Sequence, residues 1–332
     1  MQPACLNGTM ETTTLSFVDL IRGQMVAVEE AMRAHSGMHH TSLDEAVEQL
    51  LASGGKRIRP AVVLLVGEML GGKNHGLVTL AAAIEMLHTA TLVHDDLIDG
   101  SVLRRGAPTL NSRWSAGATV LTGDYIFARA AFLASQTGSL PVMEAFARTL
   151  MTIVSGEISQ ISHGPSIPDR AEYLRRIYAK TASLFELAAE GGAMLSTAEA
   201  ERVRSLKAFG YNLGIAFQMV DDVLDFVGDA RDVGKPVGSD LRHGLVTLPA
   251  IYYAENHPAA RSGLTEALAG RLEGDRLEAT IAAIAASDAV ERCMDEARSY
   301  VAEARQEIES APSNPARAAL LDLAAYVVER SV

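Results

Sequence analysis

The residues in this sequence most able to do chemistry are two groups of aspartates that share the spacing i, i+1, i+4. The stretch LVHDDLIDG carries Asp95, Asp96 and Asp99, and the stretch QMVDDVLDF carries Asp221, Asp222 and Asp225. On a helix, the first and last members of each group lie on one face, one turn apart. Like charges at that spacing repel each other, so the clusters need an outside partner.

Two interpretations are open for such clusters. A solvated, acidic helix end is the structural alternative, and it would suffice for one cluster alone. The second cluster, however, is embedded in apolar helical sequence, where carboxylates need cations or become protonated. Two facing clusters would form an oxygen-rich box suited to Mg²⁺, which binds a few carboxylates together with waters and substrate phosphates. The repeated motif therefore favours a magnesium site.

Basic residues indicate what the metal would bind. In GGKRIRPAVVLL, the basic residues Lys56, Arg57 and Arg59 precede a helix start at Pro60. The free N–H groups and dipole of a helix N-terminus favour phosphate binding. The alternative is that these residues form an exposed basic helix start that binds no ligand. Further cations are Arg104, Arg105, Lys180 and Lys235. One histidine, His88, lies two helical turns before Asp95. We expect Arg104 and Arg105 to lie in a loop where they need not pair with the carboxylates. The set favours two diphosphates, one bound through Mg²⁺ and one bound directly by Arg and Lys.

Composition limits the other classes of function. The 332 residues include 29 Lys+Arg and 41 Asp+Glu, a formal net charge of −12, which argues against a nucleic-acid partner. Cys5 and Cys293 are the only cysteines, so no disulfide framework is expected and a reducing, cytoplasmic setting fits best. The N-terminus lacks the pattern of a signal peptide. No uninterrupted apolar run of roughly 20 residues occurs, so we expect no membrane span.

The rest of the chain reads as helix. Segments such as VTLAAAIEMLHTATLVHDDL and AEYLRRIYAKTASLFELAAE are rich in Ala and Leu and contain neither Pro nor Gly. Breaks such as GGKNHG and HGPSIPDR are too short for interdomain linkers. We predict an all-α protein with a flexible N-terminal tail at residues 1–14 and one domain at residues 15–332.

The motifs and their order resemble those of the trans-polyprenyl diphosphate synthases, in particular the long-chain heptaprenyl and octaprenyl enzymes. The segments that carry the resemblance are GGKRIRP, HTATLVHDDLIDGSVLRRGAPT, YAKT, FQMVDDVLDFVGD and GKPVGSDL. It covers the chain from about residue 15 to the end. It implies the isoprenoid synthase fold, a helical bundle around a central cavity, and a homodimer. It also implies head-to-tail addition of isopentenyl diphosphate to an allylic diphosphate.

The resemblance assigns roles to individual residues. It makes Asp95, Asp99 and Asp221 ligands of three Mg²⁺ ions, with Asp96, Asp222 and Asp225 completing the clusters. The positions that hold isopentenyl diphosphate are Lys56, Arg59, His88 and Arg105. The positions that contact the allylic diphosphate are Arg104, Lys180, Thr181, Gln218 and Lys235. The family mechanism needs no Ser, Cys or His nucleophile, because the double bond of isopentenyl diphosphate attacks the allylic cation. The released diphosphate then acts as the base that takes up the proton. One position departs from the family pattern: Leu245 stands where many members carry a lysine near the leaving group.

Product length follows from the turns of helix before Asp95. The residues of this expected tunnel are Leu87, Ala90, Thr91 and Phe132. One helical turn is about 5.4 Å, close to one extended isoprene unit. In short-chain relatives a bulky aromatic side chain closes the first turn, whereas here it offers only Ala90 and Thr91. We therefore expect a membrane-seeking product of about C30 or longer, with Leu87 or Phe132 as deeper stops. Geranylgeranyl (C20) diphosphate is the alternative product.

Two other functions compete with this one. A class I terpene cyclase also ionises a diphosphate on this fold, but its second metal motif usually mixes Asn, Ser or Thr, and Glu. A non-catalytic subunit of a heteromeric synthase would typically have degraded aspartate motifs, and both motifs are intact here. Removal of one cluster charge, as in Asp95→Asn or Asp221→Asn, should relieve repulsion, so stability is expected to hold or rise.

Overall fold

The computed structural model describes residues 16–34, 41–52, 54–72, 75–104, 106–162, 166–197, 199–228 and 236–330. The predicted tail, residues 1–14, lies outside these ranges, as do two predicted site residues, Arg105 and Lys235. The other predicted site residues are all described.

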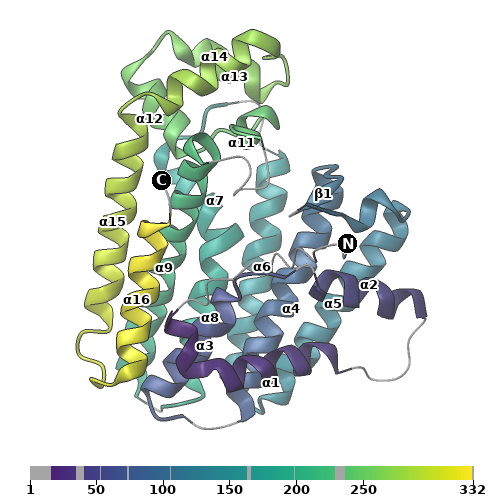
Figure 1. Cartoon of the computed structure of the whole chain (residues 1–332), viewed down its shortest axis with the longest axis vertical. Coiled ribbons are helices and arrows are strands. Elements are labelled where there is room, and N and C mark those ends of the chain that lie inside the picture. Colours follow the sequence, from purple (N-terminus) through teal and green to yellow (C-terminus); the bar gives the residue numbers. More distant parts are fainter. Residues whose placement is uncertain are drawn as a thin grey trace, which may run out of the picture.

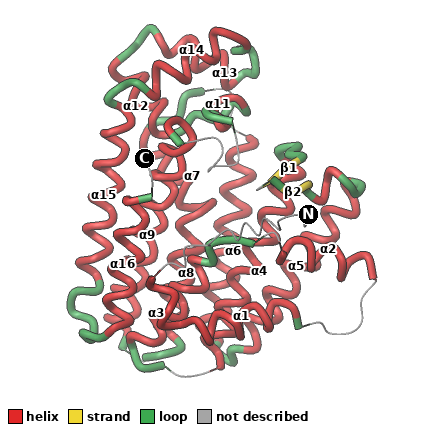
Figure 2. Tube along the Cα trace, viewed as in Figure 1, coloured by secondary structure: helices red, strands yellow, loops and turns green. Residues whose placement is uncertain are grey.

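Helices account for most of the described chain (Figure 1, Figure 2). Their bounds are η1 (Ser16–Ile21), α1 (Arg22–Arg33), α2 (Thr41–Ala52), α3 (Ile58–Met69), α4 (His75–Ile98), η2 (Leu110–Ser112), α5 (Ala116–Gln136), α6 (Leu140–Ser162), α7 (Arg170–Ile177), η3 (Tyr178–Ala182), α8 (Ser183–Met194), α9 (Ala200–Val227), α11 (Ser239–Arg242), α12 (Leu248–Asn256), α13 (Ala260–Leu268), α14 (Gly274–Ala285), α15 (Ala289–Glu307) and α16 (Pro315–Glu329). In the described ranges the only strands are the short antiparallel pair β1 (Leu103–Arg104) and β2 (Ala107–Pro108). The prediction of an all-α fold is confirmed.

Several helices begin where the local sequence favours a start. Ser115, Asp169 and Asn314 each accept a hydrogen bond from the backbone N–H three residues later, at the first turns of α5, α7 and α16. Such caps typically contribute about 1 kcal/mol each. Pro315 opens α16, where its missing N–H costs nothing. These starts follow from the local sequence alone.

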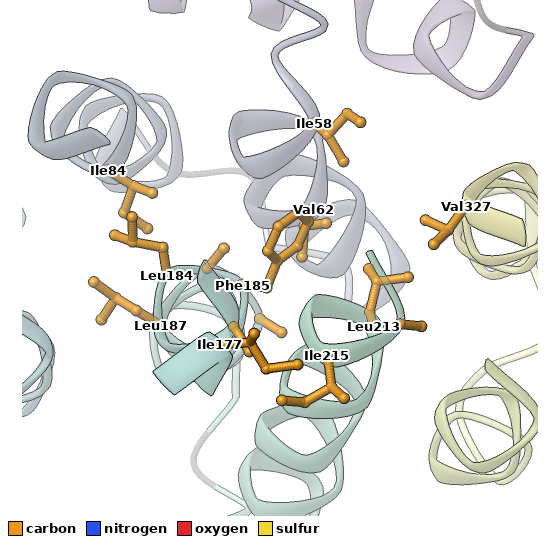
Figure 3. Close-up of a cluster of buried hydrophobic side chains, with 14 of the residues drawn as sticks. Ile58, Val62, Ile84, Ile177, Leu184, Phe185, Leu187, Leu213, Ile215 and Val327 are labelled. Carbon is orange, nitrogen blue, oxygen red and sulfur yellow. The ribbon is translucent and has the colours of Figure 1, made fainter. Parts of the chain in front are cut away.

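One cluster of buried apolar side chains runs through the described chain, from Phe17 to Val327. At its centre, Phe185 of α8 packs among side chains of α3 and α9, and Ile84 of α4 faces Leu184 of α8 (Figure 3). Helix α4 is long and apolar enough to cross a membrane by composition, but 72% of its apolar window is buried inside the protein. The burial of α4 is that of a core helix in the bundle.

The chain direction of α4 and α9 brings the two aspartate clusters to one end of the bundle. Gly72, just before α4, lies against Ser196, just before α9, so both helices start at the same end. Asp95 lies in the last turn of α4 and Asp99 directly follows that helix, while Asp221 and Asp225 lie in the last two turns of α9. Both clusters therefore lie at the opposite end of the bundle, near β1 and α11 (Figure 1).

A glycine allows α9 to approach the segment that carries Lys180 and Thr181. A Cβ atom on Gly214 would stand 2.5 Å from the Cα atom of Ala182, closer than side chains tolerate. One turn later, Gln218 Oε1 accepts a 2.6 Å hydrogen bond from Thr181 Oγ1. The close approach of two backbones thus joins two predicted site residues that are 37 positions apart in the sequence.

Candidate active site

The six aspartates divide into three that are exposed or partly exposed and three that are buried. Asp99 is exposed, and the side chains of Asp95 and Asp221 are 14% and 39% exposed. The other three are buried: Asp96, Asp222 and Asp225. The accessible three are the residues predicted as metal ligands.

Asp96 is held by an arginine from the β1–β2 hairpin. Nε of Arg104 donates to its two carboxylate oxygens at 2.9 and 3.1 Å, and Nη2 lies 2.8 Å from Oδ1. Such a forked contact fixes both partners. The expectation that Arg104 need not pair with the first cluster is therefore wrong. The β1–β2 hairpin folds back over the end of α4 and brings Arg104 to Asp96. The sequence pattern did not reveal this contact.

Asp95 faces two groups from other helices. Nζ of Lys180 lies 3.6 Å from Asp95 Oδ2 and 3.2 Å from Glu157 Oε1 on α6. Burial raises the pKa of Asp95 to about 6, while Lys180 opposes this shift and Glu157 and Asp99 add to it. Burial lowers the pKa of Lys180, but Asp95 and Glu157 outweigh it, and the net shift is upward. Lys180 therefore remains cationic beside Asp95, whose charged form is disfavoured by burial.

Lys180 and Thr181 lie in a turn with unusual geometry. Residues Tyr178–Ala182 form one turn of π-helix between α7 and α8. A π-turn inserts a wider loop into a continuous helix, and such turns often occur at functional sites. Here it directs Lys180 toward Asp95 and Thr181 toward Gln218.

Asp222 is the fully enclosed member of the second cluster. The hydroxyl of Tyr173 on α7 donates to its Oδ2 at 2.8 Å, and Gln218 Nε2 donates to its Oδ1 at 2.7 Å. Burial raises the pKa of Asp222, and the neighbouring Asp240 adds to that shift. Since Gln218 turns its nitrogen toward Asp222, its oxygen faces Thr181. Asp222 therefore orients the Gln218–Thr181 pair.

The two remaining members of the second cluster contact the following segment and the chain end. Asp225 Oδ2 accepts a hydrogen bond from the backbone N–H of Asp240 at 3.1 Å, which ties α9 to α11. Asp221 Oδ1 lies 2.6 Å from Nη1 of Arg330, which follows α16. Asp221 thus has a cationic partner that lies 109 residues later in the sequence.

The basic loop before α3 divides its residues between two tasks. Arg57 adopts a left-handed backbone (φ 47°), and its guanidinium lies 2.8 Å from both Glu29 and Glu85. On either side, Nζ of Lys56 stands over the Tyr326 ring at 5.5 Å and the guanidinium of Arg59 over the Phe185 ring at 4.8 Å. Arg57 therefore anchors the loop, while Lys56 is exposed and Arg59 half-buried. His88 is half-buried on α4.

Three of the four predicted tunnel residues lie on or near the buried side of α4. Leu87 and Ala90 are fully buried, and Thr91 is half-buried, with its hydroxyl donating to the backbone carbonyl of His88. Phe132 is 61% exposed on α5, so its role as a stop inside this chain is wrong. Its neighbours Ala130 and Ala134 occupy the buried face of α5, and helical geometry turns Phe132 outward.

Three contacting residues were missed in the sequence: Glu157, Tyr173 and Arg330. Each reaches its aspartate or lysine partner from a different helix. None lies in a distinctive local motif, because the contacts depend on how α6, α7 and α16 pack against α4 and α9. No signal in the sequence by itself identified them.

The accessible donors are suitable for a hard divalent cation. Asp95, Asp99 and Asp221 offer carboxylate oxygens, the ligands that Mg²⁺ prefers. Among the described residues, no three acidic, histidine or cysteine side chains already converge on one point.

Fold and site together define the class of the protein. An all-α bundle with two aspartate clusters at one end, each facing basic side chains, is an isoprenoid synthase fold. Residues 40–284 match the family model described as polyprenyl synthetase. The chain belongs to the polyprenyl synthetase family and is a prenyltransferase.

Named relatives cover nearly the whole chain. Component 2 of heptaprenyl diphosphate synthase from Geobacillus stearothermophilus is 37% identical over 92% of this chain and 95% of its own length. A polyprenyl synthase from Caulobacter crescentus CB15, solved with calcium and isoprenyl diphosphate, superposes with a TM-score of 0.89 at 35% identity, covering 95% of this chain and 97% of that one. A decaprenyl diphosphate synthase from Rhodobacter capsulatus gives a TM-score of 0.88 at 36% identity, covering 95% and 98%.

Proposed function

We propose that this prenyltransferase condenses isopentenyl diphosphate with an allylic diphosphate in a Mg²⁺-dependent reaction and releases a polyprenyl diphosphate of about C30 or longer. The observation that carries the proposal is the division of the aspartates. Asp95, Asp99 and Asp221 are at least partly exposed at one end of the bundle, while Asp96, Asp222 and Asp225 are buried against protein groups. Three Mg²⁺ ions on Asp95, Asp99 and Asp221 would stabilise negative charge on the departing diphosphate.

The described residues have distinct tasks in this reaction. Lys180 adds a fixed positive charge beside Asp95, where the leaving diphosphate would accumulate charge. Asp222 and Tyr173 fix the amide of Gln218 and thereby the hydroxyl of Thr181. Arg104 holds Asp96 and so keeps the hairpin near the first cluster. Lys56, Arg59 and His88 bind isopentenyl diphosphate. Arg105 and Lys235 lie outside the described residues, and the family resemblance assigns them to isopentenyl diphosphate and to the allylic diphosphate, respectively.

Incubation with radiolabelled isopentenyl diphosphate, an allylic starter and Mg²⁺ tests this function. A longer linear diphosphate supports the proposal. A cyclic hydrocarbon would identify a terpene cyclase, and the absence of any product from the protein alone would favour a subunit that needs a partner.

Product length is tested at Ala90, which is fully buried one turn before Asp95. Ala90→Phe places an aromatic ring where the growing chain would pass, so the product should shorten to about C15–C20, about one isoprene unit being lost per blocked helical turn. Ala90→Leu, with a smaller side chain, should shorten it less. Mass analysis of the dephosphorylated products decides: an unchanged length with Ala90→Phe, or a wild-type product of C20, contradicts the long-chain assignment.

A homodimer is supported by an exposed apolar stripe on α6 beside α5. Its members on α6 are Met151, Val154, Ile158 and Ile161. They recur at intervals of three and four residues and so share one face. Leu121 and Phe132 of the adjoining α5 are also more than half exposed. Contiguous apolar surface of this kind commonly marks a protein interface.

We expect Ile158→Asp to convert the dimer to a monomer, because a charge would be buried without a partner in the interface. Light scattering coupled to size-exclusion chromatography measures the mass. Val26→Asp provides the matched control, since Val26 is exposed on α1, apart from the stripe. A monomeric wild-type protein, or a variant that stays dimeric, would refute the α6 interface.

A heteromeric synthase is the second candidate arrangement, because one relative is named as a component of its synthase. Intact aspartate motifs would make this chain the catalytic component. Activity of the purified chain alone favours the homodimer.

We further propose that residues 15–332 form the catalytic domain of a cytoplasmic enzyme. Residues 1–14 form a tail that precedes this domain.

A further inference from the structure

Among the described residues, Arg330 is the most enclosed cationic group at either aspartate cluster. It follows directly after α16, and its side chain is 5% exposed. Nη1 donates to Asp221 Oδ1 at 2.6 Å, Nη2 donates to the carbonyl of Phe217 at 3.0 Å, and Nε donates to the carbonyl of Val327 at 3.1 Å. The guanidinium carbon also lies 4.1 Å from the centre of the Phe217 ring. These contacts define one position for the side chain on the last turns of α9.

A guanidinium this buried needs an anion, because an unpaired buried charge is strongly unfavourable. Among the described residues, Asp221 is the only carboxylate that contacts Arg330. The contact uses Oδ1 of a side chain that is itself 39% exposed, so Asp221 still faces the solvent at the site. The pair therefore joins a buried cation to an accessible carboxylate.

We propose that Arg330 is the resident counter-ion of Asp221 and makes metal binding at Asp221 depend on the substrate's diphosphate. The proposal rests on the proposed function, since it treats Asp221 as a metal ligand. A divalent cation on Asp221 would stand close to the fixed guanidinium charge, and like charges at such range repel strongly in a partly buried site. A diphosphate reverses this balance because it brings negative charge to both cations.

This arrangement agrees with the rest of the second cluster. Asp222 and Asp225 are already engaged by Tyr173, Gln218 and the backbone of Asp240, so neither is positioned to replace Asp221. The first cluster is arranged in the same way, with Lys180 beside Asp95. At both clusters, a partly exposed carboxylate contacts a cation from a distant part of the chain.

The test is Mg²⁺ binding to the metal-free, full-length protein, measured by titration calorimetry without substrate. Arg330→Gln removes the opposing charge but can still donate a hydrogen bond, so Mg²⁺ should bind about tenfold more tightly or better than to the wild type. Arg330→Lys keeps the charge and should resemble the wild type. In saturating inorganic diphosphate, Arg330→Gln should lose its advantage. Arg330→Met, which retains the packing on Phe217, serves if the Gln variant does not fold.

Two controls locate the effect. Arg298→Gln removes one exposed positive charge from α15 and should leave Mg²⁺ affinity unchanged. Asp221→Asn combined with Arg330→Gln should lose the gained affinity, because the ligand itself is gone. Equal Mg²⁺ affinity in wild type, Arg330→Gln and Arg330→Met overturns the proposal, as does a gain that persists without Asp221. A wild-type protein without prenyltransfer activity would overturn the proposed function instead.

Discussion

Asp95→Asn and Asp221→Asn should each lower turnover at least about a thousandfold at saturating Mg²⁺, because each removes a ligand of the ions that stabilise the leaving diphosphate. Single-turnover assays with isopentenyl diphosphate and an allylic starter measure the loss. Asp124→Asn is the matched control, since Asp124 is exposed on α5 and belongs to neither aspartate cluster. Turnover near the wild-type value in either cluster variant would contradict the assignment of metal ligands.

The same two variants should differ in stability. Burial raises the pKa of Asp95 to about 6, above its ordinary value near 3.8. A raised carboxyl pKa means that the folded protein binds the proton more tightly than the unfolded chain, so stability falls as pH rises from about 4 to about 6. Asp95→Asn removes this loss and should raise the free energy of unfolding at pH 7 by about 1–3 kcal/mol.

Asp221→Asn should instead destabilise the protein. It leaves the guanidinium of Arg330 buried without its carboxylate. Since Asp221 is partly exposed, the expected cost is about 1–2 kcal/mol, between that of a surface pair and a fully buried one. The expectation from sequence that stability would hold or rise at both positions therefore changes for Asp221. Urea unfolding in a chelator at pH 7 measures both variants, and shifts of the same sign would contradict the pairing.

Lys56→Ala and Arg59→Ala should raise the Michaelis constant for isopentenyl diphosphate about tenfold to a hundredfold, with little change for the allylic substrate. Loss of a charge-assisted phosphate contact costs about 1.5–3 kcal/mol. Initial rates with each substrate varied in turn provide both constants. Equal increases in the two Michaelis constants would show that Lys56 and Arg59 are assigned to the wrong diphosphate site.

Arg57→Ala is the contrasting variant in the same loop. Arg57 is bound to Glu29 and Glu85 and holds the only left-handed non-glycine backbone in the described chain. Its loss should lower the melting temperature by leaving Glu85 buried without its cation. The ratio of the two Michaelis constants should stay near the wild-type value. A selective rise for isopentenyl diphosphate would place Arg57 in the binding site instead.

The sequence by itself determined the helical fold, the two aspartate motifs and the family. These features are local: Ala- and Leu-rich segments favour helix wherever they lie, and an i, i+1, i+4 motif has its spacing regardless of the surrounding fold. The resemblance also singled out Asp95, Asp99 and Asp221 as metal ligands, which stays a prediction; in the structure these three side chains are exposed or partly exposed.

Only the tertiary structure decided which groups face the aspartates. Tyr173 reaches Asp222 across 49 residues and Arg330 reaches Asp221 across 109. Phe132 turned outward because the helical phase of α5 is set by its packing on α4. Contacts between distant segments depend on how helices pack and on close approaches such as that of Gly214 to Ala182, which no local pattern encodes.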